Sequence, residues 1–564
     1  MPAEQLSEEI ARVLRELGVR EPVEIAIERP KNTEHGDFAT NVALTLARPL
    51  KRAPRQIAEE LVGRLDLAAA GVRSAEVAGP GFINFRVATD YVREGLAALV
   101  RAGVDFGRAD VGADAPVVVE FVSANPTGPL HIGHGRQAAL GDAVSELLEW
   151  TGWRVQREFY YNDAGEQIAR LARSVWARYQ QQLGNDVAFP EDGYHGAYVS
   201  DVARDFIARE GERFLGEETP EALEAMRVFA VAELRAEQNR DLDEFRVHFD
   251  HFFLESSLYT SGRVEETIER LRATGLVYEK DGALWLETTR FGDDKDRVMV
   301  KSTGHPTYFL PDVAYHVTKW ERGFHRAINV QGADHHGTVA RVRAGLRALG
   351  LPEGYPEYVL HQMVLVMRGG QEVKFSKRAG SYVTLRDLFE EVGVDVTRYF
   401  FLMRRAEAQL TFDLDLALDQ SEKNPVYKVQ YAHARMASIF RRAGVDDPAA
   451  LDPDAADLAL LDQPAEQELV KLLLRFPELV ASAAERRAPH AVCEYLEETA
   501  GAVNSWYHAG NLSPELRVVG DEVPGPVSRA RLVLARAVQI VLANGLSLLG
   551  VSAPDRMERA PESA

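Results

Sequence analysis

The spacing of hydrophobic and polar positions changes along the chain and predicts regions of different structure. In the first hundred residues, apolar positions recur at helical spacing and are interrupted by short apolar runs, which is typical of a small α/β unit. The predicted helices are Leu6–Leu17, Asn41–Leu50, Arg55–Leu65 and one from Asp90, and the predicted strands are Val23–Ile27 and Phe82–Val87. The turn-rich stretch Arg108–Ala115 is expected to be a linker.

From Val117 onward, strand and helix patterns alternate, which predicts parallel βαβ units. Residues 176 to about 285 break this alternation because they are strongly charged and mostly helical in pattern, so we expect an insertion there. Strand-like runs resume near Arg326–Gln331 and Tyr358–Met367, and the chain is almost wholly helical after Asp415. The predicted fold class is multidomain α/β, with an α/β add-on domain at 1–107, a Rossmann-type parallel-sheet domain at 108–415 and an all-α bundle at 416–564.

Composition narrows the class of protein. Of the 564 residues, 46% are hydrophobic and 27% are charged, and 65 Lys and Arg against 86 Asp and Glu give a net charge of −21. This balance argues against a protein that coats nucleic acid without specificity, but it permits a local basic face. The single cysteine, Cys493, excludes an internal disulfide and a multi-cysteine zinc site. Neither a secretory pattern nor an apolar run of the ~18–20 residues that span a bilayer is evident, so we expect a cytoplasmic protein.

Residues 123–134, with the sequence S-A-N-P-T-G-P-L-H-I-G-H, form the most informative segment. They follow the apolar strand Val117–Phe121 and lead into a helical pattern. His131 and His134 share one face of the first helical turn, where unpaired backbone N–H groups and the helix dipole favour an anion. Gly133 has no side chain, so a flat ligand such as a nucleobase can approach the backbone. The segment predicts a phosphate-binding site, although H-x-x-H pairs also occur on helix surfaces and in metal sites.

A second segment, Lys374-Phe375-Ser376-Lys377-Arg378, lies in a predicted loop after a strand, with glycines on both sides. Two lysines three residues apart, with a serine between them, suit a mobile clamp over a polyphosphate. A basic turn exposed to solvent is the alternative, and it is the commoner case when such a segment stands alone. Here the segment follows the histidine pair by about 240 residues.

This pairing resembles the HIGH and KMSK signatures of class I aminoacyl-tRNA synthetases. Further segments are similar to those of bacterial arginyl-tRNA synthetases, and the resemblance covers essentially the whole chain. These segments are Phe121–Arg136, Phe159–Gly165, Gly332–Gly337, His35–Asn41 and Val541–Val551. The resemblance implies that the chain activates L-arginine with ATP, releases pyrophosphate and transfers arginine to the 2′-hydroxyl of the terminal adenosine of its tRNA. It also implies that activation depends on tRNA.

The resemblance assigns the ATP site and the catalytic groups. His131 and His134 are expected to stabilise charge on the phosphates, and Lys374 and Lys377 to close over them. The other expected ATP-binding residues are Gly133, Asp334, His335, Met363, Val364 and Ser376. Mg²⁺ is expected to accompany ATP rather than to occupy an all-protein cage. Phe375 and Arg378 replace the Met and the final Ser of the KMSK consensus.

The arginine site is also assigned by the resemblance. Glu120 and Asp312 are expected to bind the guanidinium, which needs planar carboxylate partners, and Tyr308 is expected beside them. Ser123 and Asn125 are expected to hold the α-amino and carboxylate end. Gln331 is a further candidate, whereas Gly128 stands where some family members carry a lysine. From the residues alone, an edge-strand salt bridge for Glu120 and a helix cap after Pro311 for Asp312 remain open.

For tRNA, the helical region mixes basic and aromatic residues, a composition that suits single-stranded RNA. The candidates are Lys423, Tyr427, Lys428, Gln430, Tyr431, His433 and Arg435, followed by Arg441 and Arg442. Tyrosines at helical spacing are equally typical of the core of a bundle. In the N-terminal region, Phe82 and Asn84 occupy the place that resembles a D-loop contact, although Phe82 also fits a strand that faces the core.

Two other functions share some of these features. A small-molecule nucleotidyltransferase has the histidine motif and the nucleotide fold but needs no large helical tail. A non-catalytic synthetase-like RNA-binding paralogue is expected to lose one of the two motifs, and both are present. Asp334-His335-His336 has no third ligand nearby in sequence, so we expect no zinc. The expected partners are tRNA, L-arginine and ATP, with no membrane and no obligate protein partner, and the family expectation is a monomer.

Overall fold

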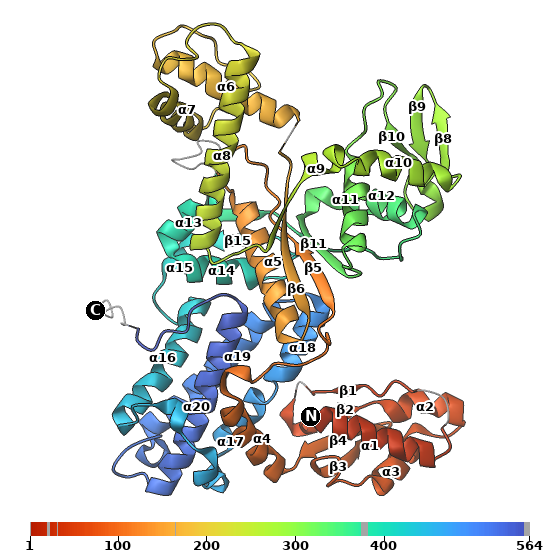
Figure 1. Ribbon diagram of the computed structural model, residues 1–564. Coiled ribbons are helices and arrows are strands. Elements are labelled where there is room, and N and C mark those ends of the chain that lie inside the picture. Colours follow the sequence, from red (N-terminus) through yellow and green to blue (C-terminus); the bar gives the residue numbers. More distant parts are fainter. Residues whose placement is uncertain (1, 20–22, 31, 164, 374–381, 558–564) are drawn as a thin grey trace. The chain divides into compact units, whose positions relative to one another are not determined.

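The computed structural model describes residues 2–19, 23–30, 32–163, 165–373 and 382–557. These residues form two compact units, which are described separately (Figure 1). The first unit contains residues 1–103, 439–474 and 505–538, and the second contains residues 104–438, 475–504 and 539–564. The helical C-terminal region therefore contributes to both units.

The N-terminal part of the first unit is a four-stranded antiparallel sheet in the order β1-β2-β4-β3, packed with helices. The strands are β1 (Ile27–Glu28), β2 (Phe38–Thr40), β3 (Val72–Ala78) and β4 (Phe82–Val87), and the helices are α1 (Pro2–Glu16), α2 (Val42–Leu50), α3 (Pro54–Arg64) and α4 (Thr89–Ala102). Along β4, buried Ile83, Phe85 and Val87 alternate with Phe82 and Asn84, which face away from the core.

The four helices and β4 agree with the sequence-based predictions to within a few residues, but the strand expected at Val23–Ile27 is wrong over most of its length. Only Ile27 and Glu28 pair, because their partner β2 is three residues long. The Ala26 carbonyl instead accepts a hydrogen bond from the Thr40 hydroxyl at 2.7 Å. The short strand β2 and the strand β3 were not predicted.

The first unit also includes α17 (Pro464–Leu473), which packs against α4. Gly95 in α4 makes this approach possible, because a Cβ there would lie 2.7 Å from the Leu474 side chain. The Lys471 ammonium on α17 forms an ion pair with Asp37 at 2.8 Å. A second ion pair joins Arg101, in the last turn of α4, to Asp454.

The second unit is built around a five-stranded parallel sheet in the order β12-β11-β5-β6-β7. The strands are β5 (Pro116–Glu120), β6 (Arg154–Tyr161), β7 (His251–Leu254), β11 (Ala327–Gly332) and β12 (Glu357–His361). The chain builds outward from β5 to β7 and then returns to the other side of β5 with β11. The carboxyl ends of β5 and β11 therefore meet where the strand order reverses, which is where open parallel sheets bind ligands.

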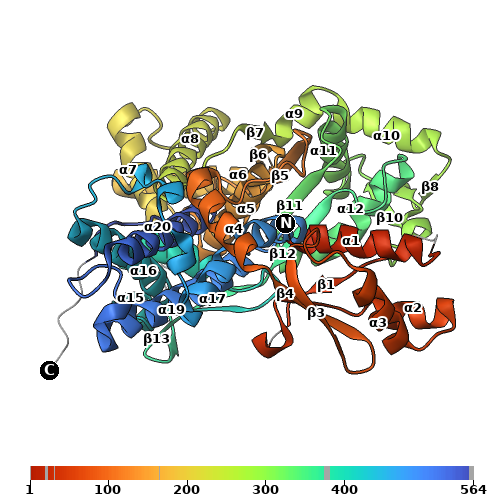
Figure 2. The same ribbon diagram turned by 90° about the horizontal axis from the view of Figure 1, so that it is seen from below.

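Helix α5 (Ile132–Trp150) follows β5 and is buried along most of its length. Helices α11 (Phe309–Glu321) and α12 (His336–Ala348) lie side by side, as both views show (Figure 2). Their apolar residues, among them Phe309, Val313 and Leu346, form a core with Val118 of β5. This packing fixes α11 over the carboxyl end of the sheet.

The insertion expected at about 176–285 is divided in two, because β7 returns to pair with β6 in the main sheet. The first part is helical and has its own core around Tyr179, Phe206 and Phe229. It contains α6 (Glu166–Gln182), α7 (Ala197–Glu210) and α8 (Pro220–Glu244). The second part contains α9 (Glu255–Thr260), α10 (Arg263–Ala273) and the antiparallel strands β8 (Val277–Lys280), β9 (Ala283–Leu286) and β10 (Arg297–Val300). Strand β7 was not predicted, because four residues are too short a run to be recognised as a strand within this charged region.

A second sheet, in the order β14-β13-β15, follows the parallel one, and helices complete the chain. The strands are β13 (Val364–Arg368), β14 (Gln371–Glu372) and β15 (Leu410–Asp413), and the helices are α13 (Leu385–Val392), α14 (Val394–Leu402), α15 (Leu414–Leu418), α16 (Pro425–Ala443), α18 (Phe476–Arg486), α19 (His490–Leu512) and α20 (Gly525–Leu548). Helix α20 is long and apolar enough to cross a membrane, but 83% of its most apolar stretch is buried inside the protein. It has the environment of a core helix.

Candidate active site

A cavity of about 500 Å³ lies at the carboxyl ends of β5 and β11, and α11 and α12 contribute to its wall. Its lining includes the carboxylates Glu120, Asp312 and Glu255. At the end of β5 the chain turns sharply, since Val122 and Ser123 have φ values of 65° and 44°. This turn carries the backbone from the sheet to the start of α5.

The two motif histidines form the N-terminus of α5. His131 is the N-cap, and its Nδ1 accepts a hydrogen bond from the His134 N–H at 3.2 Å. In return, the His131 N–H donates to Nδ1 of His134 at 3.4 Å, and the two rings stack with their centroids 3.6 Å apart. Because each Nδ1 accepts a bond, the neutral rings carry their proton on Nε2.

Burial lowers the pKa of both histidines. The pKa of His134 falls well below its usual value, and the neighbouring His131 and His361 add to this effect. Both rings are therefore neutral at physiological pH. A side chain at position 133 would also crowd the motif, because a Cβ there would lie 2.8 Å from the His131 ring.

Arg136, one turn further along α5, is fully buried and binds carbonyl groups instead of a carboxylate. It donates to Gln362 O at 2.6 Å, to Arg405 O at 2.9 Å and to Ala408 O at 3.1 Å. Burial lowers its pKa to about 10. Arg136 thus ties the helix that carries the histidines to the segment before Met363, a role that sequence reasoning missed because an arginine in a helix is ordinarily exposed.

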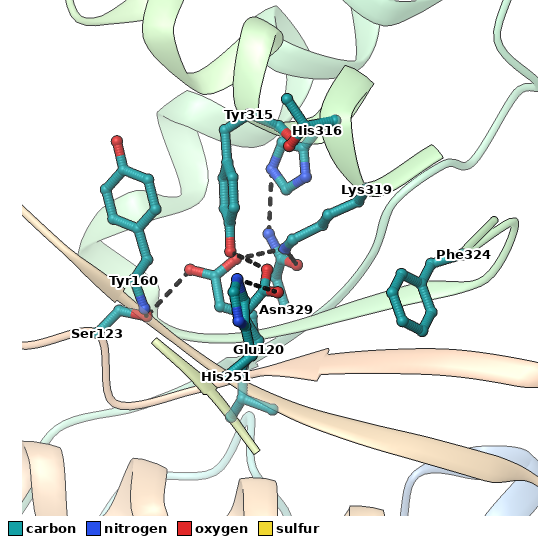
Figure 3. A network of polar contacts seen from close by, with 12 residues as sticks. Glu120, Ser123, Tyr160, His251, Tyr315, His316, Lys319, Phe324 and Asn329 are labelled. Carbon is teal, nitrogen blue, oxygen red and sulfur yellow. Dashed lines mark hydrogen bonds and ion pairs between the residues drawn. The ribbon is translucent and has the colours of Figure 1, made fainter. Parts of the chain in front are cut away.

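Glu120 is buried, and Figure 3 shows its polar partners. Its Oε2 accepts from the fully buried Lys319 Nζ at 2.6 Å, and its Oε1 accepts from the Ser123 hydroxyl at 3.1 Å. Beside it, Glu158 accepts from the Tyr315 hydroxyl at 2.6 Å and forms two bonds with Arg322. Glu120 thus forms a salt bridge, but from the central strand β5 rather than from an edge strand, and this salt bridge joins the centre of the sheet to α11.

Asp312, in the first turn of α11, has a different environment. No ion pair or hydrogen bond to its carboxylate occurs among the described residues, so it is not the helix cap that the residues alone left open. Burial, together with the nearby Glu120 and Glu255 carboxylates, raises its pKa to about 7. The site therefore presents a carboxylate whose charge is poorly compensated, which favours a cationic ligand.

The other expected arginine-binding residues also line the cavity. Tyr308 is 79% exposed and lies at its rim, and Gln331 lies near the end of β11. The Ser123 hydroxyl accepts from the Tyr160 N–H at 3.2 Å. The Asn125 amide donates to Gln167 at 2.6 Å, so part of its hydrogen-bonding capacity is used within the protein.

The expected ATP-binding residues fall into two groups. Asp334 and His335 are exposed in a 3-10 turn that follows β11, with His335 lining the cavity, whereas Met363 is 75% exposed immediately before β13. The adjacent Val364 is buried. Lys374, Ser376, Lys377 and the rest of that loop lie outside the described residues. Among the described residues, no group of three or more His, Cys, Asp or Glu is placed to hold a metal ion.

The expected tRNA-binding residues on α16 differ in exposure. Gln430, His433 and Arg435 are buried: Gln430 donates to Asp395 and Ser552 at 2.9 Å, His433 lies 3.0 Å from Pro554 O, and Arg435 bonds to Asn504. The side chains of these three residues make these contacts within the protein. Lys423 is exposed, and Tyr427, Lys428 and Tyr431 are partly exposed. In the N-terminal sheet, Phe82 is 42% exposed and does not face the core.

Comparison with known proteins identifies this arrangement. Three family models match successive parts of the chain: the arginyl tRNA synthetase N terminal domain at 4–87, the class I (R) tRNA synthetase catalytic domain at 97–405 and the DALR anticodon binding domain at 429–557. The chain belongs to the arginyl-tRNA synthetase family. Its activity is the ATP-dependent ligation of arginine to tRNA.

Relatives in this family match over nearly the full length. The arginine–tRNA ligase of Thiobacillus denitrificans is 54% identical over 98% of this chain and 99% of its own, and that of Geobacter metallireducens is 55% identical over 94% and 95%. The Thermus thermophilus arginyl-tRNA synthetase structure has a TM-score of 0.76 at 25% identity and covers 99% of this chain and 100% of its own. These matches favour the synthetase over both a nucleotidyltransferase and a non-catalytic paralogue.

Several residues of the synthetase site were not found from the sequence. Lys319 contacts Glu120, and Asn329 contacts Lys319. Glu255 accepts a hydrogen bond from the Tyr160 hydroxyl at 2.9 Å. Tyr160 lies in the Phe159–Gly165 segment, which carries part of the family resemblance. This resemblance was the sequence signal that could have pointed to Tyr160. Lys319 gave no signal, because a lysine at the end of an amphipathic helix is usually exposed.

Proposed function

We propose that the cavity binds L-arginine and that the start of α5 binds ATP, so that the arginine carboxylate attacks the α-phosphorus and pyrophosphate leaves. The 2′-hydroxyl of the terminal adenosine then attacks the carbonyl of the arginyl-adenylate, and AMP leaves. The observation that carries this proposal is the position of the poorly compensated Asp312 carboxylate in the same cavity wall as His134. One cavity thus offers an anionic site for a cationic side chain beside a helix N-terminus for phosphates.

The guanidinium end of arginine binds Asp312 and Glu120 in this proposal. A guanidinium has only N–H donors, and the two carboxylates have only acceptors when ionised. Asp312 supplies the counter-charge, and Glu120 supplies an oriented acceptor because its oxygens are already held by Lys319 and Ser123. Tyr308 and Gln331 border this end, and Ser123 and Asn125 border the α-amino and carboxylate end.

His131 and His134 act as neutral hydrogen-bond donors toward the phosphates. Their Nδ1 atoms are occupied by backbone N–H groups, so the Nε2–H groups are the ones available to a ligand. A neutral donor that strengthens its bond as charge develops on the phosphate oxygens lowers the barrier without a proton transfer. The adenosine lies over Gly133 and against Met363, Val364, Asp334 and His335.

The loop that contains Lys374, Ser376 and Lys377 closes over the polyphosphate, and Mg²⁺ arrives with ATP as part of the substrate. The tRNA contacts proposed here are Phe82 and Asn84 for the D-loop and Lys423, Tyr427, Lys428 and Tyr431 for the anticodon arm. The domain division is 1–107, 108–415 and 416–564. We further propose a cytoplasmic monomer without a membrane or an obligate protein partner.

The experiment is ATP–pyrophosphate exchange with each of the twenty amino acids, with and without tRNA, followed by aminoacylation with labelled arginine. Exchange and charging with arginine alone are the expected results. Exchange that needs no amino acid would support a nucleotidyltransferase, and tRNA binding without exchange or charging would support a non-catalytic RNA-binding protein.

A further inference from the structure

Helix α11 carries three polar side chains on the face that borders the cavity. Asp312, His316 and Lys319 are spaced four and three residues apart, which places them along one side of the helix. Lys319 is fully buried, and a buried ammonium is costly unless it is paired and hydrogen-bonded. The chemistry proposed above gives it no direct contact with arginine or ATP.

The donors and acceptors around Lys319 can be assigned in only one consistent way. Its ammonium donates to Glu120 Oε2 at 2.6 Å and to Asn329 Oδ1 at 3.1 Å. Since lysine can only donate, the Asn329 amide nitrogen must face the other way, where it lies 3.2 Å from His316 Nε2. His316 is neutral because burial lowers its pKa well below the usual value, so its Nε2 can accept this bond.

The strand register supports the same arrangement. Asn329 of β11 pairs directly with Glu120 of β5, so the amide and the carboxylate project from neighbouring points of the sheet. Figure 3 shows Lys319 reaching down from α11 to both side chains. His316 closes the series from the same helix, and it also lines the cavity.

Glu120 is the end point of this series. With Lys319 on Oε2 and Ser123 on Oε1, rotation of the carboxylate is restricted, while each oxygen retains a second lone pair for a ligand. The Lys319 charge also compensates the Glu120 charge within the wall. A guanidinium entering the cavity therefore meets a fixed acceptor at Glu120 and a poorly compensated charge at Asp312.

We propose that Lys319 is a positioning residue for arginine recognition. Asn329 holds its ammonium in place, and His316 orients Asn329 in turn. Lys319 orients the Glu120 carboxylate and neutralises its charge, so that Asp312 is left as the counter-ion of the guanidinium. This inference rests on the proposed function of the cavity. If the inference holds, changes at Lys319 affect arginine binding but not ATP binding, because Lys319 contacts neither the motif histidines nor the start of α5.

The experiment compares Lys319→Met with Lys319→Arg in the full-length protein, with Thr318→Val as a matched control on the same helix. Within the described part of the chain, the Thr318 hydroxyl bonds to the Tyr315 carbonyl of its own helix and to no other group. Lys319→Met is expected to raise the arginine KM and the arginine Kd from equilibrium dialysis by about 10- to 100-fold, with the ATP KM within about twofold of wild type. Lys319→Arg, which keeps the charge, should recover part of the loss, and Thr318→Val should leave both KM values unchanged.

Two further variants keep the test decisive if Lys319→Met does not fold. Asn329→Leu removes the amide that holds Lys319, and His316→Phe removes the ring that orients this amide. Each should raise the arginine KM by about three- to tenfold, again without changing the ATP KM. Wild-type arginine KM values in all folded variants, or parallel increases in the arginine and ATP KM values, would overturn the inference. If the wild-type protein itself fails to charge tRNA with arginine, the proposed function fails first, and the two failures are thereby distinguished.

Discussion

The Lys471 ammonium lies 2.8 Å from the Asp37 carboxylate and joins a helix of the C-terminal region to the N-terminal sheet. Asp37 is well placed for this contact, because its other oxygen accepts the Val87 N–H at 2.8 Å and its own N–H donates to Phe85 O. Burial of Lys471 would lower its pKa, but Asp37 and Glu468 raise it, so the pair stays ionised. The His35–Asn41 motif thus has a structural role in addition to marking the family.

This pair predicts a measurable coupling energy between the two regions. Lys471→Met and Asp37→Asn should each destabilise the protein, and the double variant should lose less than the sum of the two. Since the pair is only partly shielded from water, the coupling is expected to be about 0.5–1.5 kcal/mol. Urea unfolding of the four proteins in a double-mutant cycle measures it. Strict additivity would mean that the contact contributes nothing.

Asp312→Asn should impair the use of arginine far more than the use of ATP. The amide keeps the shape of the carboxylate but turns N–H donors toward a ligand that itself has only donors. Steady-state kinetics with each substrate varied in turn would show a large rise in the arginine KM with a nearly constant ATP KM. Unchanged arginine kinetics would leave Asp312 without a role in binding.

Arginine binding should also release protons near neutral pH. In the empty cavity the pKa of Asp312 is raised to about 7, so the carboxyl is partly protonated there, and a bound guanidinium lowers this pKa again. Affinity for arginine should therefore fall as the pH drops below 7. Calorimetry in buffers of different ionisation enthalpy should detect the release of up to about half a proton at pH 7. Asp312→Asn is the control, and release that persists in it would exclude Asp312 as the source.

His134→Ala should fold normally and lose formation of the aminoacyl-adenylate. The loss of one donor toward developing negative charge costs on the order of 2.7–4 kcal/mol in barrier height. Pyrophosphate exchange in the presence of tRNA measures the loss, and circular dichroism checks the fold. Exchange close to that of the wild type would rule out the role assigned to this imidazole.

Activation of arginine should require tRNA. The expected cause is a population shift between an open and a closed arrangement of the Lys374–Lys377 segment and the arginine cavity. RNA that binds the closed arrangement more tightly than the open one increases the population of the closed arrangement. Exchange with RNA-free protein should be weak and should rise on addition of tRNA whose 3′ end cannot be charged. Strong exchange without RNA would remove this dependence but would leave the ligase activity intact.

Activity should not depend on zinc. Treatment with a zinc chelator, followed by restoration of Mg²⁺, is expected to leave aminoacylation unchanged, since the single cysteine provides no multi-thiolate site. Elemental analysis of the purified protein is the independent check. Stoichiometric zinc would contradict the prediction.

Periodicity predicted the helices and the chemistry-bearing turn well because these features are local. Helices α2 and α3, strand β4 and the start of α5 all follow from the spacing of nearby residues. Strands β2 and β7 were missed, since short strands are defined by partners far away in sequence, as Phe38 is by Phe85.

In the candidate site, too, some residues could be predicted from the sequence and others could not. Glu120, Asp312 and His134 were identified through family motifs, and all three line one cavity. Lys319 could not be found, because its ion pair with Glu120 spans 199 residues and depends on the position of α11 over the sheet. The burial of Gln430 and Arg435 likewise could not be predicted from a helical pattern of basic and aromatic residues.

The return of the chain to the sheet at β7 has a practical consequence for labelling this protein. Because β7 closes the helical excursion α6–α8 before the next one begins, extra residues placed within that excursion do not alter the pairing of β5, β6 and β11. The exposed residues 217 and 218, between α7 and α8, are therefore a suitable insertion point for a fluorophore-binding tag. A reporter there would leave the cavity and the strand register as they are.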